Sequence, residues 1–156
     1  MKHLQERYQR QLMLNEFGLE AQEKLSNAKV LVIGAGGLGC PILQYLVAAG
    51  VGHIGIADDD VVSYSNLNRQ ILFGQQDVGR FKVAIAKEKL LLMNDTITIK
   101  SWKQRWSQKD CINHFKEYAI IVDARNGYKV YDPCKPPYKS YTLDETELSE
   151  GKILLT

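Results

Sequence analysis

One short segment, residues 34–39, limits what this chain can fold into more than any other part of it. Its sequence is GAGGLG, with glycine at the first, third and sixth positions. The apolar run before it, residues 28–33, is rich in β-branched side chains and predicts a buried parallel strand. The apolar stretch after it, residues 41–49, predicts a helix that begins with a proline. A glycine-rich turn between such a strand and such a helix is typical of nucleotide-binding α/β folds.

Each glycine of this turn has a separate physical use in such folds. Gly34 permits the tight turn, Gly36 lets phosphates approach backbone N–H groups, and Gly39 lets the helix pack closely on the strand. A second predicted strand, residues 53–57, completes a β-α-β unit, and Asp58 follows it. An acidic residue about 20 residues after the turn is suited to hold a ribose hydroxyl. The motif therefore predicts a nucleotide site, and on this motif alone an NAD-dependent oxidoreductase would be favoured.

The middle of the chain continues the alternation of helices and strands. The apolar spacing predicts a helix over residues 81–93, a strand over 96–100, a short helix around 111–115, and a fourth strand over 118–122 before Asp123. This order predicts an α/β fold, namely a Rossmann-like, doubly wound and mostly parallel sheet.

Both ends of the chain differ from this pattern. Residues 7–25 have helical spacing that is broken at Gly18, which predicts a short N-terminal helical segment. Turn signals dominate after residue 125, and strand-like pieces lie between them at residues 128–131, 140–143 and 153–155. We therefore expect a small irregular or antiparallel C-terminal appendage within a single domain that spans residues 1–156.

Length and charge narrow the possible functions. A chain of 156 residues is long enough for one domain with a proper core. Its formal net charge of +2 is too weak to predict a nucleic-acid or membrane partner. No segment approaches the roughly 20 apolar residues of a membrane span, and the polar N-terminus shows no signal peptide. We expect a cytoplasmic protein.

The three cysteines, Cys40, Cys111 and Cys134, are odd in number and far apart. They predict no disulfide framework, which fits a reducing cytoplasm. No Cys-x-x-Cys pair is present in the sequence, so no structural zinc is expected.

The loop after the second predicted strand, residues 58–70 (DDDVVSYSNLNRQ), separates the possible nucleotide-binding functions. A dehydrogenase has no evident use for it, whereas a nucleotidyl transfer needs cations to neutralise the leaving pyrophosphate. Arg69 and Lys82 are suited to that task, the first as a planar fork and the second as a point charge. Asn66 offers a neutral hydrogen bond in the same loop. The alternative is that both cations are solvated surface charges.

These residues carry a resemblance to a known family. The loop resembles the D-x-D-x-V-x-x-S-N-L-x-R-Q signature of the ThiF/MoeB/HesA-type adenylyltransferases, which belong with the ubiquitin-activating enzymes. Further segments are similar to that family in order and spacing: residues 7–11 (RYQRQ), 18–22 (GLEAQ), 48–52 (AAGVG) and 78–82 (VGRFK). The resemblance covers residues 7–124 and implies a Rossmann-like nucleotide-binding domain.

The resemblance implies an ATP-dependent adenylyltransferase. The C-terminal glycine carboxylate of a small ubiquitin-like sulfur-carrier protein would attack the α-phosphate of ATP and yield an acyl-adenylate and pyrophosphate. Because a carboxylate is already a nucleophile, positioning and charge neutralisation would matter more than a general base. The implied cofactors are ATP and Mg²⁺, and the implied partners are the carrier protein and a second family subunit in a homodimer or heterodimer. The product would serve thiamine, molybdopterin or a related biosynthesis.

The resemblance also implies roles for individual residues. Arg69 and Lys82 would stabilise charge at the reacting phosphates, and Arg10 would reach into the site of a neighbouring subunit. Simple exposure to solvent is the alternative for Arg10. The residues implied to bind ATP are Gly34, Gly36, Gly37, Gly39, Asp58, Ser65, Asn66, Leu67, Asn68, Arg69 and Lys82.

The sequence departs from the family's pattern after the fourth predicted strand. The family motif there is D-x-T-D-N, whose second aspartate holds Mg²⁺, and here it reads DARNG from Asp123 onward. The second aspartate falls on Asn126, a neutral and poorer magnesium ligand, so Asp123 becomes the candidate metal ligand. We expect residues 125–156 to form an atypical short tail, because family members continue further with the surface that grips the carrier.

Two other functions remain open at this point. The chain could be a non-catalytic nucleotide-binding partner that completes another subunit, like one half of the heterodimeric activating enzymes. It could also be an NAD-dependent oxidoreductase, which would leave the loop at residues 65–70 unexplained. A preference for ATP over NAD separates the oxidoreductase from the other two.

Overall fold

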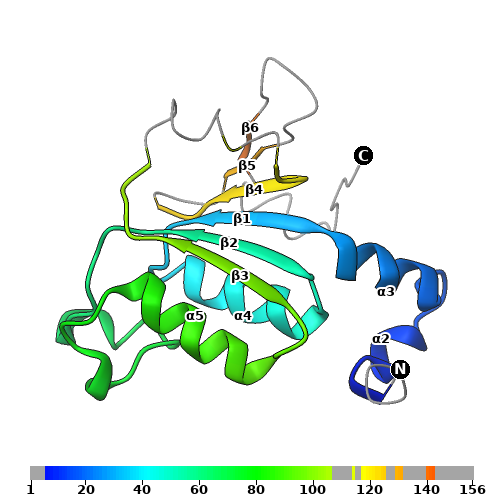
Figure 1. Cartoon of the computed structure of the whole chain (residues 1–156), viewed down its shortest axis with the longest axis horizontal. Helices are drawn as coiled ribbons and strands as arrows, with labels where there is room; N and C mark the ends of the chain where they lie inside the picture. The colour runs from blue at the N-terminus through cyan, green and yellow to red at the C-terminus, as the bar shows by residue number, and fades with distance from the viewer. Residues whose placement is uncertain (1–5, 107–113, 115–116, 126–128, 132–139, 143–156) are drawn as a thin grey trace.

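The chain folds around one mixed sheet. Its structure, a computed structural model, describes residues 6–106, 114, 117–125, 129–131 and 140–142. Within these ranges the strand order is β3-β2-β1-β4-β5-β6 (Figure 1). The strands are β1 (Lys29–Ile33), β2 (His53–Ala57), β3 (Thr98–Trp102), β4 (Ile120–Asp123), β5 (Lys129–Tyr131) and β6 (Ser140–Thr142). Strands β1 to β4 are parallel, while β5 and β6 pair antiparallel at one edge, which confirms the expected α/β fold.

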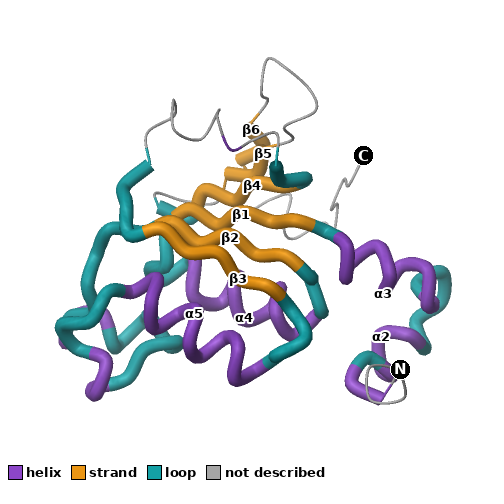
Figure 2. The backbone as a smooth tube through the Cα atoms, in the orientation of Figure 1, coloured by secondary structure: helices purple, strands orange, loops and turns teal. Residues whose placement is uncertain are grey.

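The helices of the described residues pack against one face of the sheet and beside it. They are α2 (Gln9–Leu12), α3 (Gly18–Asn27), α4 (Gly39–Ala49) and α5 (Lys82–Met93), with 3-10 turns η1 (Tyr64–Asn66) and η2 (Gln75–Asp77). Figure 2 shows α4 and α5 together under one face, and α2 and α3 beyond the amino end of β1. Within the described ranges, every helix is too short or too polar to span a lipid bilayer.

The residues of β1 alternate between two apolar cores. Val30 and Val32 pack with apolar residues of α4 and α5 in the larger core. Leu31 and Ile33 point to the opposite face, where they join a smaller core with Trp106. These four residues are each at most 3% exposed, whereas Lys29, the first residue of β1, is exposed. Burial on both faces explains why this strand reads as a continuous apolar run and not as an alternating one.

The N-terminal helices are attached to the C-terminal end of α4. Gly50 ends α4 in a left-handed conformation with φ of +87°, and a side chain there would overlap the ring of Tyr8. The Gln11 amide donates to the Ala49 carbonyl at 2.9 Å, and the Asn94 amide donates to the Tyr8 hydroxyl at 2.9 Å. These bonds hold α2 and α3 against the body of the domain.

Local backbone conformation and hydrogen bonds explain where two of the predicted elements begin. The N-terminal helical segment divides before Gly18, as its spacing predicted, because Gly18 has a φ of +58°. The strand predicted from residue 96 begins instead at Thr98. Its first two predicted residues belong to a turn, in which the Thr96 N–H and hydroxyl both donate to the Asn94 side chain.

The fourth strand begins at Ile120, two residues later than predicted. Tyr118 supplied part of the strand signal, but its ring is buried in the smaller core and lies outside the paired residues. The predicted strand pieces near residues 128–131 and 140–143 are confirmed as β5 and β6. Apart from His114, the helix expected around residues 111–115 lies outside the described residues, as does the strand expected at 153–155.

We predict that Gly39→Ala destabilises the fold. A Cβ added at Gly39 would lie 1.9 Å from the Gly34 carbonyl oxygen, so α4 would have to move away from the turn. Such overpacking lowers the free energy of unfolding by about 1–3 kcal/mol or more, which urea denaturation measures. The matched control is Gly36→Ala, whose added Cβ has its nearest neighbour at 3.7 Å. We expect that control to change the unfolding free energy by less than about 1 kcal/mol, and equal losses would contradict the close-packing argument.

Candidate functional site

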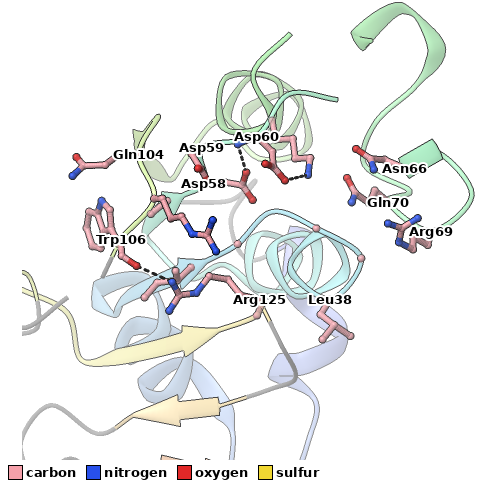
Figure 3. A pocket seen from close by; sticks show the side chains of 18 residues that line it. Leu38, Asp58, Asp59, Asp60, Asn66, Arg69, Gln70, Gln104, Trp106 and Arg125 are labelled. Carbon is pink, nitrogen blue, oxygen red and sulfur yellow. Dashed lines mark hydrogen bonds and ion pairs between the residues drawn. The ribbon is translucent and has the colours of Figure 1, made fainter. Parts of the chain in front are cut away.

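A cavity of about 700 Å³ opens at the carboxyl ends of β1, β2 and β4. This is the edge at which parallel α/β sheets bind ligands. Figure 3 shows the acidic residues after β2 between the loop of Asn66 and Arg69 on one side and Trp106 on the other. The residues that line the cavity are Ile33, Gly34, Gly36, Gly37, Leu38, Ala57, Asp58, Asp59, Asp60, Asn66, Arg69, Gln70, Lys82, Gln104, Arg105, Trp106, Ala124 and Arg125.

Asp58 fastens the end of β2 to the glycine-rich turn after β1. Its Oδ2 accepts the Ala35 N–H at 2.7 Å, and its Oδ1 accepts the Asp60 N–H at 2.8 Å. The carboxylate therefore borders the cavity and at the same time fixes the turn that forms the cavity's floor. Gly36 and Gly37 also line the cavity, whereas Gly39 stands behind them in the packing of α4.

Lys82 is the buried cation of the site. It begins α5, its side chain is 5% exposed, and its Nζ donates to Asp60 Oδ2 at 2.8 Å. A buried ammonium is costly unless it is paired, and the Asp60 carboxylate supplies that partner. The Lys82 backbone N–H also donates to the Asp60 carbonyl at 3.0 Å, so the pair is held at both main chain and side chain. Lys82 thus presents a positionally fixed positive charge to the cavity.

The loop before Lys82 divides into residues that face the cavity and residues that support them. Asn66 and Arg69 line the cavity, as expected. Ser65 and Asn68 do not line it, but they orient Arg69, whose Nη1 donates to the Ser65 carbonyl at 2.8 Å and to Asn68 Oδ1 at 3.1 Å. Leu67 packs against the larger core and lies away from the cavity.

Gln70 is a cavity residue that the motif analysis did not assign. Its side chain is 3% exposed, and its Oε1 has no hydrogen-bond partner among the described residues. A buried acceptor without a partner costs about 1–3 kcal/mol, so a ligand that donates to it would recover that energy. Its place directly after Arg69 in the recognised signature was the signal that could have identified it.

The segment after β3 forms another wall that the sequence did not predict. Gln104, Arg105 and Trp106 line the cavity there. Trp106 is 2% exposed, and its ring stacks on His114 with ring centroids 4.5 Å apart. Nothing in the spacing of this segment indicates a site, because its contacts depend on how the chain leaves β3.

Asp123 and Arg125 form a bidentate ion pair at the end of β4. The Arg125 Nε donates to Asp123 Oδ1 at 2.9 Å, and its Nη2 donates to Oδ2 at 2.7 Å. Arg125 lines the cavity and Asp123 does not. Both carboxylate oxygens thus face a guanidinium, an arrangement that does not fit a magnesium ion on Asp123. Asn126 lies outside the described residues.

A second group of carboxylates, Asp58, Asp59 and Asp60, has oxygen atoms within 4.8 Å of one another. Two of the three are already engaged, since Asp58 accepts backbone N–H groups and Asp60 pairs with Lys82. The third carboxylate, Asp59, is exposed.

Two further residues lie apart from the cavity chemistry. Arg10 is exposed on α2, near the amino end of the sheet, and does not line the cavity. Cys40 is fully buried in α4, and burial raises the pKa of its thiol to about 11. The thiol therefore stays protonated at neutral pH and is unsuited to act as a nucleophile. Cys111 and Cys134 lie outside the described residues.

Comparison with known proteins agrees with this geometry. Residues 8–128 match the model of the ThiF family. A probable adenylyltransferase/sulfurtransferase MoeZ of Mycobacterium tuberculosis is 45% identical over 150 residues, which cover 94% of this chain and 38% of that protein. A sulfur carrier protein adenylyltransferase of Thermus thermophilus is 42% identical over 123 residues, which cover 79% of this chain and 45% of that protein. The chain therefore spans less than half the length of these relatives.

Solved structures show the same arrangement of elements. The Escherichia coli tRNA N6-threonylcarbamoyladenosine dehydratase TcdA in complex with ATP has a TM-score of 0.71 and 25% identity, over 80% of this chain and 51% of that one. The Escherichia coli MccB structure with AMPCPP and MccA has a TM-score of 0.65 and 27% identity, over 75% of this chain and 42% of that one.

We predict that Asp58→Ala destabilises the glycine-rich turn. The change removes the acceptor of the Ala35 and Asp60 N–H groups, and leaving such donors without a partner costs about 1–3 kcal/mol. Urea denaturation should show that loss. Asp59→Ala is the matched control: Asp59 is exposed in the same cluster, and we expect a change within about 0.5 kcal/mol. A loss in Asp59→Ala as large as in Asp58→Ala would contradict the assigned role.

Proposed function

The chain belongs to the ThiF family, and from that premise we propose that it binds ATP to adenylate the C-terminal glycine carboxylate of a small ubiquitin-like sulfur-carrier protein. The observation that carries the proposal is the cavity in which the glycine-rich turn, Arg69 and the buried Lys82 lie together. The names of the relatives support the same reaction, since they include a sulfur carrier protein adenylyltransferase. A cytoplasmic location, with its supply of ATP, is part of this proposal.

The cavity suits ATP in both shape and chemistry. Gly36 and Gly37 leave the backbone of the turn open to phosphate oxygens, and the Arg69 side chain lies within van der Waals distance of the Cβ position at Gly37, at 3.5 Å. Asp58 is placed for the ribose, because a carboxylate oxygen that accepts one N–H can still accept a hydroxyl. The Gln70 Oε1 offers a further acceptor.

Lys82 and Arg69 would carry the chemical step. The attacking carboxylate oxygen forms a bond to the α-phosphorus, and the bond to the bridging oxygen breaks as pyrophosphate leaves with the electron pair. Negative charge grows on the leaving group, and the two cations lie ready to neutralise it. Because Lys82 is already held by Asp60 at 2.8 Å, little reorganisation is needed when the phosphates arrive. ATP would bring Mg²⁺ on its phosphate oxygens and water.

Arg10 would act on a neighbouring subunit. It is exposed near the amino end of the sheet, so it cannot serve the cavity of its own chain. We propose a homodimer or a heterodimer with another family member, in which this side chain enters the partner's cavity.

A second candidate function is a non-catalytic nucleotide-binding subunit. The observation that favours it is the Asp123–Arg125 pair, which engages the carboxylate at the first aspartate of the family's D-x-T-D-N motif. Such a subunit would still bind ATP, but it would not exchange pyrophosphate without a partner. The proposed enzyme and the proposed subunit are therefore separated by turnover and not by binding.

We predict that the chain binds ATP in preference to NAD, and that Lys82→Ala weakens ATP binding by about tenfold or more, as expected for a lost charge-assisted bond. Isothermal titration calorimetry measures both affinities. Lys24→Ala is the matched control, because Lys24 is an exposed lysine on α3 that pairs with Glu20 at 2.8 Å. Tighter binding of NAD, or equal effects of the two substitutions, would contradict the proposal.

We predict ATP–pyrophosphate exchange when the chain is mixed with a sulfur-carrier protein that ends in glycine. Removal of that terminal glycine should abolish the exchange, because it removes the attacking carboxylate. Incorporation of labelled pyrophosphate into ATP measures the reaction. Normal ATP binding without exchange would favour the non-catalytic subunit instead.

A further inference from the structure

Arg125, two residues after β4, presents a guanidinium to the cavity, and in sequence it directly precedes Asn126, the position of the family's magnesium aspartate. We propose that Arg125 binds the phosphates of the nucleotide and takes over the charge neutralisation that a protein-bound magnesium ion would provide. ATP affinity then depends little on magnesium. This inference rests on the proposed function, because it concerns how the same cavity holds its nucleotide.

The Arg125 side chain donates hydrogen bonds from all three of its guanidinium nitrogens. Two run to the Asp123 carboxylate, and the third joins its Nη1 to the Trp106 carbonyl at 2.7 Å. The aliphatic part of the side chain lies against the first glycine of the turn, since a Cβ at Gly34 would be 3.2 Å from Arg125 Cγ. The side chain is 35% exposed and lines the cavity. Arg125 therefore lies beside the glycine-rich turn, within reach of a phosphate bound there.

The same bonds weaken the case for a metal held by the protein. Magnesium demands oxygen ligands in near-octahedral geometry and is usually held by one or two carboxylates together with phosphates. Both oxygens of Asp123 are engaged by Arg125, whose positive charge would repel a dication at that position. The next family position is Asn126, which carries no charge.

The charges around the cavity point the same way. Its lining contains the three carboxylates of Asp58, Asp59 and Asp60 and the four cations of Arg69, Lys82, Arg105 and Arg125. The lining therefore carries a formal net charge of +1, which favours an anionic ligand. Since the Asp123–Arg125 pair has no net charge, Arg125 contributes to phosphate binding at short range only.

The test is calorimetric titration of the full chain with ATP, in one buffer with excess Mg²⁺ and in another with EDTA. We expect the unsubstituted chain to bind ATP in EDTA within about threefold of its affinity in magnesium. For Arg125→Gln we expect a loss of about tenfold in EDTA, partly restored by magnesium because Asp123 is released from its partner. Arg125→Lys, which keeps the charge and loses the fork, should lie between the two. Arg80→Gln is the matched control, since Arg80 pairs with Glu88 at 3.0 Å outside the cavity.

The outcomes separate this inference from the proposed function. ATP binding that falls more than about tenfold in EDTA would overturn the role of Arg125 and leave ATP binding itself intact. An equal loss for Arg125→Gln in both buffers would also overturn it, because a purely structural role predicts that result. Circular dichroism and thermal unfolding show whether the variants are folded. If Arg125→Gln does not fold, the role of Arg125 is tested by comparing the ATP affinities of the unsubstituted chain and of Arg125→Lys in the two buffers. Absence of ATP binding in both buffers would overturn the proposed function together with this inference.

Discussion

The close contact between the start of α4 and the turn after β1 is the constraint on which the site depends. Gly39 has no side chain, so the first turn of the helix lies directly against the Gly34 carbonyl. The Cys40 N–H then donates to the Gly36 carbonyl at 2.9 Å, and Asp58 holds the Ala35 N–H from the neighbouring strand. Backbone packing therefore sets the shape of the glycine-rich turn at which phosphates are proposed to bind.

Three cations of this cavity have protein partners in the absence of a ligand. Lys82 pairs with Asp60, Arg125 pairs with Asp123, and Arg69 donates to the carbonyl of Ser65. These partnerships reduce the cost of keeping charge near a partly buried surface, and they hold the cations in place. If the cavity binds phosphates as proposed, these cations are already ordered, so binding would require little further ordering of the protein.

The sequence predicted the regular helices and strands, and the glycine-rich turn, better than it predicted the irregular segments. Strand β2 has the predicted bounds, and the glycine-rich turn lies where its motif placed it, because local spacing and turn chemistry determine both. The start of β4 was predicted too early, since the apolar ring of Tyr118 looks like a strand residue but packs in a core. Within the cavity, the motif identified Lys82 and Arg69 but not Trp106 or Arg125. Those two meet through a hydrogen bond between segments that are distant in sequence, and no periodicity encodes such a meeting.

Helix α4 connects the cavity to the N-terminal helices α2 and α3. It has 11 residues, which makes it a rod about 16 Å long. Its first turn borders the phosphate side of the cavity, and the carbonyl of its last residue, Ala49, accepts bonds from the side chains of Gln11 and Gln22. If the chain binds a nucleotide as proposed, a tilt of this rod would be passed on to α2, whose exposed surface carries Arg10. The cavity and the surface proposed to meet a second subunit are thus joined by one rigid element.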